Sequence, residues 1–156
     1  MTNGKLFVIS GASGVGKSTV LTRVMESRKD LLFSVSATTR APRKGETEAV
    51  SYYFVSKQEF EDMIQKNEFL EYNAHAGNYY GTPKDPVDDM LREGKAVILE
   101  IDVQGADKIK EIYPDVVRIF IMPPSVSVLE RRLRGRNTED EESQTCYRKR
   151  RNENGF

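Results

Sequence analysis

The stretch Gly11-Ala12-Ser13-Gly14-Val15-Gly16-Lys17-Ser18 fits the pattern G-x-x-x-x-G-K-[ST], which is the phosphate-binding P-loop. In such a loop the glycines let consecutive backbone N–H groups point inward at phosphate oxygens. Lys17 adds a cation for the β- and γ-phosphates, and the Ser18 hydroxyl can ligate Mg²⁺. The pattern therefore predicts a nucleoside triphosphate site, and the alternative is a plain glycine-rich turn.

The flanking residues favour the P-loop. Residues 6–9 are an apolar run typical of a buried strand, and residues 18–25 are expected to form the helix whose N-terminus faces the anion. Two later apolar runs, 96–102 and 116–122, are expected to be central parallel strands covered on both faces. Strands that alternate with helices in this way predict an α/β fold, with a P-loop parallel sheet flanked by helices.

Residues 38–82 interrupt this alternation and are expected to form a small mixed α+β lobe over the carboxyl edge of the sheet. Ser56 and Glu59 form a capping box that predicts a helix start. A later helix is expected with Asp85 as N-cap and Pro86 as its first residue, ending near Gly94. Short strands are expected at residues 31–36, 52–55 and 69–74, and a turn carrying aromatic residues at 77–81.

The composition is that of a soluble globular protein and indicates one domain. The chain has 156 residues, of which 38% are hydrophobic and 31% charged. Its formal net charge is zero, so we expect no nucleic-acid partner and no membrane partner. The lone Cys146 cannot form an internal disulfide, and no run reaches the roughly 18 apolar residues of a membrane span. A cytoplasmic protein is expected, with its oligomeric state open.

Two acidic residues stand at the end of the apolar run 96–102. Glu100 and Asp102 are two apart, which predicts that both face the same side of their strand at its carboxyl end. Such a pair can order the water shell of Mg²⁺ or accept hydrogen bonds from a hydroxylated substrate. The alternative is a pair of solvent-exposed charges at a strand end.

Several further blocks resemble the guanylate kinase family, in the order found there. The resemblance extends from the first strand to about Ser143. It rests on the P-loop and on these blocks: Ser34-Val35-Ser36-x-Thr38-Thr39-Arg40-x-Pro42-Arg43-x-Gly45-Glu46, Glu68-Phe69-x-Glu71, Gly77-Asn78-Tyr79-Tyr80-Gly81-Thr82, Glu100-Ile101-Asp102-x-Gln104-Gly105, Pro123-Pro124-Ser125, Arg132-Leu133 and Gly135-Arg136.

The resemblance implies a role for each matching residue. ATP would be held by Gly11, Ala12, Ser13, Gly14, Val15, Gly16, Lys17, Ser18 and Thr19. The phosphate of GMP would be held by Arg40, Arg43, Tyr52 and Tyr80, and guanine would be contacted by Ser36, Glu71, Thr82 and Glu100. Ser18 and, through water, Asp102 would serve Mg²⁺. Tyr53 and Tyr79 are expected to pack the lobe rather than to bind.

The reaction implied is phosphoryl transfer from ATP to GMP or dGMP, which gives ADP and GDP or dGDP. Phosphoryl transfer needs alignment and cations around the transferring group. Those cations would come from Lys17, Arg40, Arg43, Arg132 and Arg136. A non-catalytic guanylate-kinase-like binding module is the alternative, and the intact Lys17 and P-loop glycines disfavour it. A related kinase with another small phosphorylated substrate is disfavoured by the guanine-contacting set.

The resemblance also implies that residues 1–156 form one guanylate kinase-like domain with several parts. A core would comprise residues 1–37 and 83–125, a GMP-binding lobe residues 38–82, and a helical lid residues 126–143. Residues 144–156 depart from the family pattern and end in a basic run without apolar periodicity. The expectation from this break is a truncated chain, for example after a frameshift, that lacks part of the adenine pocket and whose activity is impaired.

Overall fold

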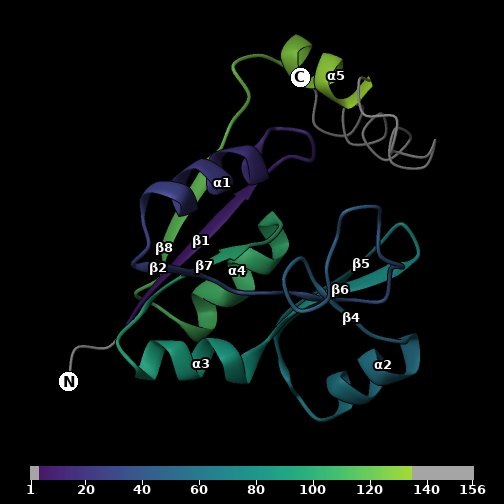
Figure 1. The fold of residues 1–156 in the computed structure, drawn as a ribbon, viewed down its shortest axis with the longest axis vertical. Coiled ribbons are helices and arrows are strands. Elements are labelled where there is room, and N and C mark those ends of the chain that lie inside the picture. The colour runs from purple at the N-terminus through teal and green to yellow at the C-terminus, as the bar shows by residue number, and fades with distance from the viewer. Residues whose placement is uncertain (1–3, 135–156) are drawn as a thin grey trace.

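The computed structural model describes residues 4–134, which form two sheets and the helices around them (Figure 1). The first sheet is all parallel and has the order β2-β7-β1-β8. The second is mixed and has the order β4-β3-β6-β5. The first sheet comprises β1 (Lys5–Gly11), β2 (Leu31–Phe33), β7 (Ala96–Glu100) and β8 (Val117–Ile121), and the second β3 (Ala37–Thr38), β4 (Tyr53–Phe54), β5 (Phe69–His75) and β6 (Asn78–Pro83).

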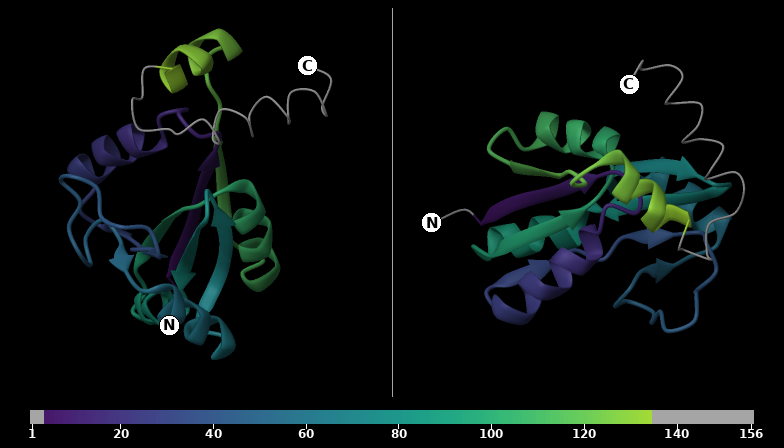
Figure 2. Two further views of the ribbon diagram at one scale, coloured as in Figure 1. Left: turned by 90° about the vertical axis from the view of Figure 1, so that its right-hand side faces the viewer. Right: turned by 90° about the horizontal axis from the view of Figure 1, so that it is seen from above.

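Helices cover both faces of the first sheet, which confirms the expected α/β fold. Helix α1 lies on one face and α4 on the other (Figure 2, left). The described helices are α1 (Lys17–Ser27), α2 (Lys57–Gln65), α3 (Lys84–Arg92), α4 (Val103–Ile112) and α5 (Val126–Arg134). Helix α4 also lies beside the second sheet, where it packs against β5 (Figure 1).

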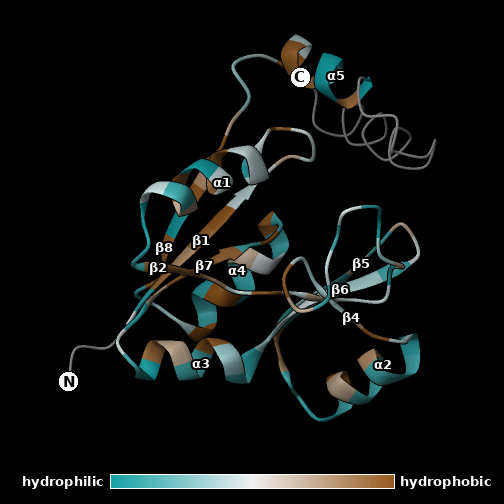
Figure 3. Ribbon diagram, in the orientation of Figure 1, coloured by the Kyte–Doolittle hydropathy of each residue, from teal (hydrophilic) through white to brown (hydrophobic). Residues whose placement is uncertain are grey.

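The core is split by the first sheet, because alternate residues of a strand face opposite sides. Leu6 and Val8 of β1 pack with residues of α3 and α4 on one face. Ile9 packs with Leu21 of α1 on the other. Hydropathy colouring shows the apolar residues concentrated in β1 and β7 (Figure 3). The carboxyl end of β1 leads directly into the P-loop, so this buried strand fixes where the loop lies.

The second sheet is held together by aromatic packing around Phe60 of α2. The Phe60 side chain is fully buried, and its ring stacks on Phe69 at 4.4 Å and on Tyr79 at 5.2 Å between ring centroids. Helix α2 begins with the predicted capping box: Ser56 Oγ accepts from the Glu59 N–H at 3.2 Å, and Glu59 accepts from the Ser56 N–H at 2.7 Å. Tyr79 therefore packs the lobe, as the sequence predicts.

The turn expected at residues 77–81 is wrong, because most of that segment is strand β6. The actual hairpin loop is Ala76-Gly77, and both residues have positive φ, 48° and 74°. Two such residues between paired strands, here His75 opposite Asn78, make the mirror-image turn that suits a hairpin. The two tyrosines of this segment thus alternate between the faces of a strand.

Helix α3 begins earlier than its sequence suggests. Asp85 and Pro86 lie inside its first turn, and the helix starts at Lys84 with Pro83 as the N-cap residue. The Lys84 N–H donates to Glu68 O at 2.8 Å, which ties the start of the helix to the second sheet. Pro86 is tolerated there because the first turn of a helix makes no intrahelical N–H bonds. The predicted end is right: Gly94 follows the helix with a φ of 77°.

Strand β8 also differs from its prediction. Within residues 4–134 it is an edge strand of the first sheet, and four of its five residues are exposed rather than covered on both faces. Ile119 and Phe120 are 44% and 55% exposed. An uninterrupted apolar run does not distinguish an edge strand from a central one, so the prediction of a central strand was wrong. Strand β2 is shorter than residues 31–36, because Ala37 and Thr38 turn into the second sheet.

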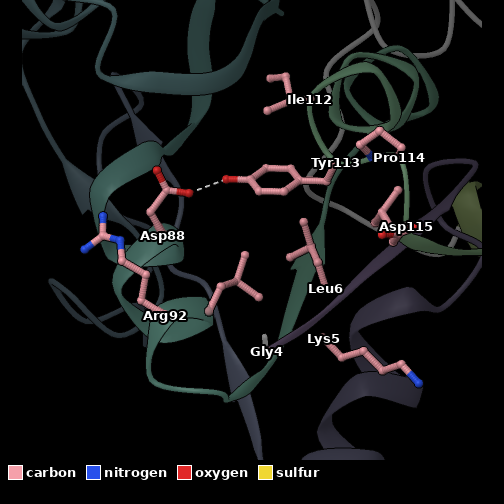
Figure 4. Close-up of a pocket in the computed structure, with 11 residues that line it drawn as sticks. Gly4, Lys5, Leu6, Asp88, Arg92, Ile112, Tyr113, Pro114 and Asp115 are labelled. Atoms are coloured by element: carbon pink, nitrogen blue, oxygen red, sulfur yellow. Dashed lines mark hydrogen bonds between the residues drawn. The ribbon is translucent and has the colours of Figure 1, made fainter. Parts of the chain in front are cut away.

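A cavity of about 510 Å³ opens at the amino end of β1, the end remote from the P-loop (Figure 4). Leu6, Leu91 and Tyr113 line it, and the Tyr113 hydroxyl donates to Asp88. Burial raises the pKa of Tyr113. None of the sequence-predicted site residues lines this cavity, and ligands of open α/β sheets bind at the carboxyl ends of the strands. The functional site is therefore expected at the other end of the sheet, beside the P-loop.

Across residues 4–134, no helix combines the length and apolar character needed to cross a membrane.

Candidate active site

The P-loop joins β1 to α1 and has a tightly turned backbone. Gly14 and Gly16 have φ values of 75° and 103°, which L-residues with side chains rarely adopt. The Lys17 ammonium bends back over the loop and donates to Gly11 O at 2.9 Å and to Ala12 O at 3.3 Å. Gly16 is the N-cap residue of α1, so the positive end of the helix dipole opens into the loop. Thr19 follows on the exposed side of the first helical turn.

Helix α5 rests on this loop from a distant part of the chain. One guanidinium nitrogen of Arg132, Nη1, donates to Val15 O at 2.6 Å. Leu133 lies so close that a Cβ on Gly14 would come within 2.6 Å of its Cδ2 atom. The structure therefore brings the predicted cation Arg132 to the P-loop. Arg136, expected on the same helix face, lies outside the described residues, as does the segment after residue 143.

Glu100 ends β7 beside the P-loop helix. The Ser18 hydroxyl donates to its Oε1 atom at 3.0 Å, and Glu100 pairs in register with Ile9 of β1. Its charge also contributes, after burial and Tyr80, to a raised pKa of Tyr52 in the second sheet. Glu100 is thus located between the phosphate loop and the lobe.

Asp102 lies just beyond the end of β7 and has other partners than Glu100. Strand β7 ends at Glu100, and the chain turns at once into α4 with Asp102 as its N-cap residue. Asp102 Oδ1 accepts from the Gly105 N–H at 2.7 Å, and Oδ2 accepts from the Asn73 side-chain amide of β5. The structure brings Glu100 to Ser18, and it brings Asp102 to β5.

Glu71 and Thr82 face one another across the β5–β6 hairpin. They are register partners, and the Thr82 hydroxyl donates to Glu71 Oε1 at 2.6 Å. Both side chains are buried, with exposures of 6% for Glu71 and 1% for Thr82. Burial raises the pKa of Glu71, and the nearby Asp102 charge raises it further, whereas the Thr82 hydrogen bond opposes the shift. A buried carboxylate of this kind is a strong acceptor for a ligand with paired N–H groups.

Arg40 is held by a partner that the sequence analysis did not assign to the site. Its two terminal nitrogens donate to both carboxylate oxygens of Glu46, at 3.0 and 2.8 Å, and Glu46 also accepts from the Arg43 N–H at 2.7 Å. The Arg40 guanidinium lies 5.5 Å from the centre of the Tyr52 ring. The Glu46 hydrogen bond raises the pKa of Arg40, and Arg40 in turn lowers that of Glu46.

Tyr52 and Tyr80 meet edge to face, with ring centroids 6.2 Å apart, so the structure gathers Arg40 and both tyrosines. The Arg43 side chain is exposed beside this group. Ser36 lies just before β3, and its carbonyl accepts from the Tyr53 N–H at 2.9 Å.

Glu46 could have been identified from the sequence, because it is an acid three residues after Arg43 and six after Arg40.

Comparisons with known proteins agree with this geometry. The sequence model of the family described as guanylate kinase matches residues 3–153. The guanylate kinase of Synechocystis sp. is 51% identical over 138 residues, which cover 88% of this chain and 72% of the relative. That of Clostridium tetani is 55% identical over 143 residues, which cover 92% of this chain and 68% of the relative.

Among solved structures, the crystal structure of guanylate kinase from Anaplasma phagocytophilum is similar with a TM-score of 0.74 at 41% sequence identity. The match covers 84% of this chain and 66% of that chain, so the chain spans about two thirds of the solved relative. The family match over nearly the whole sequence and the shared fold lead to one conclusion: this chain belongs to the guanylate kinase family.

Proposed function

We propose that the chain catalyses phosphoryl transfer from ATP to GMP, and also to dGMP. An oxygen of the GMP phosphate forms a new bond to the γ-phosphorus of ATP. The bond from that phosphorus to the β,γ-bridging oxygen breaks, the electron pair stays with that oxygen, and ADP and GDP leave. The observation that carries the proposal is the combination of an intact P-loop with the buried Glu71–Thr82 pair. The curated guanylate kinases support the same reaction.

Residues 11–19 fit the triphosphate of ATP. The P-loop glycines have backbone conformations that direct N–H groups inward, and the Lys17 ammonium lies over the loop, where it would reach the β- and γ-phosphates of bound ATP. Arg132 lies over the same loop and would add positive charge from the proposed lid. These cations would hold the donor phosphates and offset the charge that spreads over the transferring group.

Ser18 and Glu100 fit a magnesium site, because a hydroxyl and a carboxylate are hard oxygen donors in contact with each other at the P-loop. Mg²⁺, when bound there, would supply positive charge that offsets the charge of the phosphates during transfer. Ser18 would ligate it directly, and Glu100 would accept from its water shell. This exchanges the roles that the sequence suggests for Glu100 and Asp102, because Asp102 is engaged as the cap of α4.

The second sheet fits GMP. Arg40, Arg43, Tyr52 and Tyr80 provide a guanidinium fork and phenol hydroxyls for the phosphate. Glu71 would accept from the adjacent N1–H and N2–H₂ of guanine, with Thr82, Ser36 and Asp102 completing the contacts. Adenine carries an acceptor at N1 and no 2-amino group, so it leaves the buried carboxylate unmatched, at a cost of about 1–3 kcal/mol or more.

We also propose the division into core, lobe (38–82) and lid (126–143). The second sheet spans residues 37–83 and α5 begins at Val126, so the boundaries fit the elements. We propose a cytoplasmic location, because a single cysteine suits a reducing compartment. No feature of residues 4–134 favours a non-catalytic binding module, since Lys17 and all three P-loop glycines are retained.

The experiment that tests the function is a coupled assay of ADP release with ATP and GMP, and in parallel with dGMP, AMP and UMP. We expect turnover with GMP and dGMP, none above background with AMP or UMP, and its loss in Lys17→Ala. Calorimetric titration of GMP and ATP separately accompanies the assay. A folded protein that binds neither nucleotide contradicts the proposal.

A further inference from the structure

The first turn of α4 packs closely against the side chain of Glu71. An ideal Cβ built on Gly105 would lie 2.7 Å from Glu71 Oε2 and 3.1 Å from its Cδ atom. The next nearest atom is Ile101 Cδ1, at 3.3 Å. Real Cβ atoms do not approach other atoms within 3.0 Å, so the position admits only glycine while the carboxylate keeps its place.

Glycine is otherwise a poor choice at this position. Gly105 is buried inside helix α4, at its third residue, and its φ is not positive. In a helix interior glycine is less favourable than alanine by about 1 kcal/mol. The backbone gains nothing from glycine here, and the close approach of Glu71 is what the missing side chain permits.

Further hydrogen bonds hold the first turns of α4 against β5, so the helix is not free to shift away from Glu71. Asp102 fixes the helix start by accepting from the Gly105 N–H at 2.7 Å, and its second oxygen accepts from Asn73. Asn73 is two residues after Glu71, on the same face of β5. One turn further along α4, the Lys108 ammonium donates to Tyr72 O at 3.2 Å.

We propose that Gly105 is a specificity-positioning residue. By lacking a side chain it lets the Glu71 carboxylate lie between Thr82 and the first turn of α4, aimed to accept from N1–H and N2–H₂ of guanine together. This inference rests on the proposed function, because it assigns the guanine contact to Glu71. It makes α4 of the core, and not the lobe alone, a determinant of base selection.

The test replaces Gly105 by alanine and measures nucleotide affinities by calorimetric titration of the full chain with GMP, IMP and ATP separately. IMP keeps N1–H and lacks the 2-amino group, so the GMP-to-IMP affinity ratio reports on carboxylate alignment. We expect Gly105→Ala to weaken GMP at least about tenfold, to lower the GMP-to-IMP ratio, and to leave ATP affinity within about twofold.

Glu111→Ala on the exposed face of α4 is the matched control, and it should leave all three affinities unchanged. A second pair of variants isolates the steric cause. Glu71→Asp withdraws the carboxylate by one methylene, so it should cost less GMP affinity in the Gly105→Ala background than in the unaltered chain. Independent effects of the two substitutions, multiplying without coupling, would contradict the proposal.

The remaining outcomes are also decisive. Unchanged GMP affinity in Gly105→Ala overturns the positioning role and leaves the proposed function standing. Equal loss of ATP and GMP affinity overturns it too, since a displaced carboxylate in the lobe does not act on the P-loop. Failure of the unaltered chain to bind GMP overturns the proposed function, and this inference with it.

Discussion

The P-loop is built by consecutive residues of one segment, whereas the pocket around Glu71 is assembled from the β5–β6 hairpin and from helix α4, which comes later in the chain. In the loop, the Lys17 ammonium donates to backbone carbonyls of Gly11 and Ala12 in the same segment. In the pocket, Glu71 of β5 meets Thr82 of β6, and the first turn of α4 closes in from residue 105. The first site depends on local backbone conformation and the second on long-range packing.

This difference concerns how each site fails. A phosphate site made of backbone amides loses its cation when Lys17 is changed, but the loop keeps its path. A base site made of a buried carboxylate is sensitive to any group that shifts Glu71, because a misplaced charge there has few other partners. We therefore expect changes near the P-loop to affect rate, and changes near Glu71 to affect selectivity.

The largest effect is expected at Lys17. Lys17→Ala should lower kcat by on the order of 10³, because it removes the cation at the transferring phosphate, while GMP affinity changes by no more than about twofold. Steady-state kinetics and GMP titration measure both quantities. Lys29→Ala, an exposed lysine just beyond α1, is the control and should behave as the unaltered chain. A parallel loss of GMP affinity in Lys17→Ala would remove the distinction between the two sites.

The next largest effect is expected at Glu71. Glu71→Gln should lower kcat/KM for GMP by about 10²-fold or more, because the amide cannot accept from both guanine N–H groups. The same variant should raise the thermal midpoint of the ligand-free protein at neutral pH. Burial raises the pKa of Glu71, so the folded state binds its proton more tightly than the unfolded state and the ionised carboxylate opposes folding. Scanning calorimetry checks the sign; a lower midpoint contradicts it.

Glu100 and Asp102 provide a direct test of the division between the sites. Glu100→Gln should raise the Mg²⁺ concentration for half-maximal rate by about tenfold and leave KM for GMP nearly unchanged. Asp102→Asn should raise KM for GMP and leave the Mg²⁺ requirement nearly unchanged, and asparagine can still cap α4. Rates measured across Mg²⁺ and GMP concentrations separate the two. The roles suggested by sequence alone would be restored if Asp102→Asn changed the Mg²⁺ requirement.

A smaller effect is expected from pH. The carboxylate form of Glu71 is the one that accepts from guanine, and its pKa is raised above the ordinary carboxyl range by burial. GMP affinity should therefore fall as pH is lowered through that raised pKa, before ordinary surface carboxylates are protonated. Titration of GMP at several pH values measures the fall, and in Glu71→Gln this component should be missing. ATP affinity over the same range provides the reference.

The smallest effect is expected outside both sites, at the capping box of α2. Ser56→Ala should lower the free energy of unfolding by about 1 kcal/mol, because it removes the acceptor of the Glu59 N–H. Kinetic constants should stay unchanged, since Ser56 contacts neither proposed nucleotide site among the described residues. Denaturant unfolding and the ADP-release assay measure the two; an altered KM for GMP would show that lobe stability and base selection are coupled.

The same contrast explains what the sequence predicted. The α/β fold and the capping box follow from local patterns, and the structure confirms them. The predicted start of α3 and the turn predicted at residues 77–81 were wrong. The Lys84–Glu68 hydrogen bond sets the start of the helix, and pairing with β5 makes most of that segment strand β6. The hairpin loop Ala76-Gly77 was missed, because the aromatic residues that follow it were interpreted as part of the turn.

The site residues divide similarly. A spacing of two residues suggested that Glu100 and Asp102 act as a pair, and the end of β7 at Glu100 gives them different partners, Ser18 for Glu100 and the first turn of α4 for Asp102. Gly105 was visible in the sequence only as the last residue of a block shared with the family, and Asn73 was not singled out, because a close approach or a side-chain tie to another element leaves no local trace. Glu46 was visible as the acid among the cations of residues 40–46 and needed only the bidentate geometry to be assigned.

The position of β8 at the edge of the sheet has a consequence for amide hydrogen exchange. Within residues 4–134, β8 pairs with β1 on one side only, and alternate residues of a strand direct their N–H groups to opposite sides. The N–H groups that point to β1 are protected, and those between them face outward. Exchange rates along β8 should therefore alternate with a period of two, while residues 7–9 of β1, which are paired on both sides, should be protected without alternation.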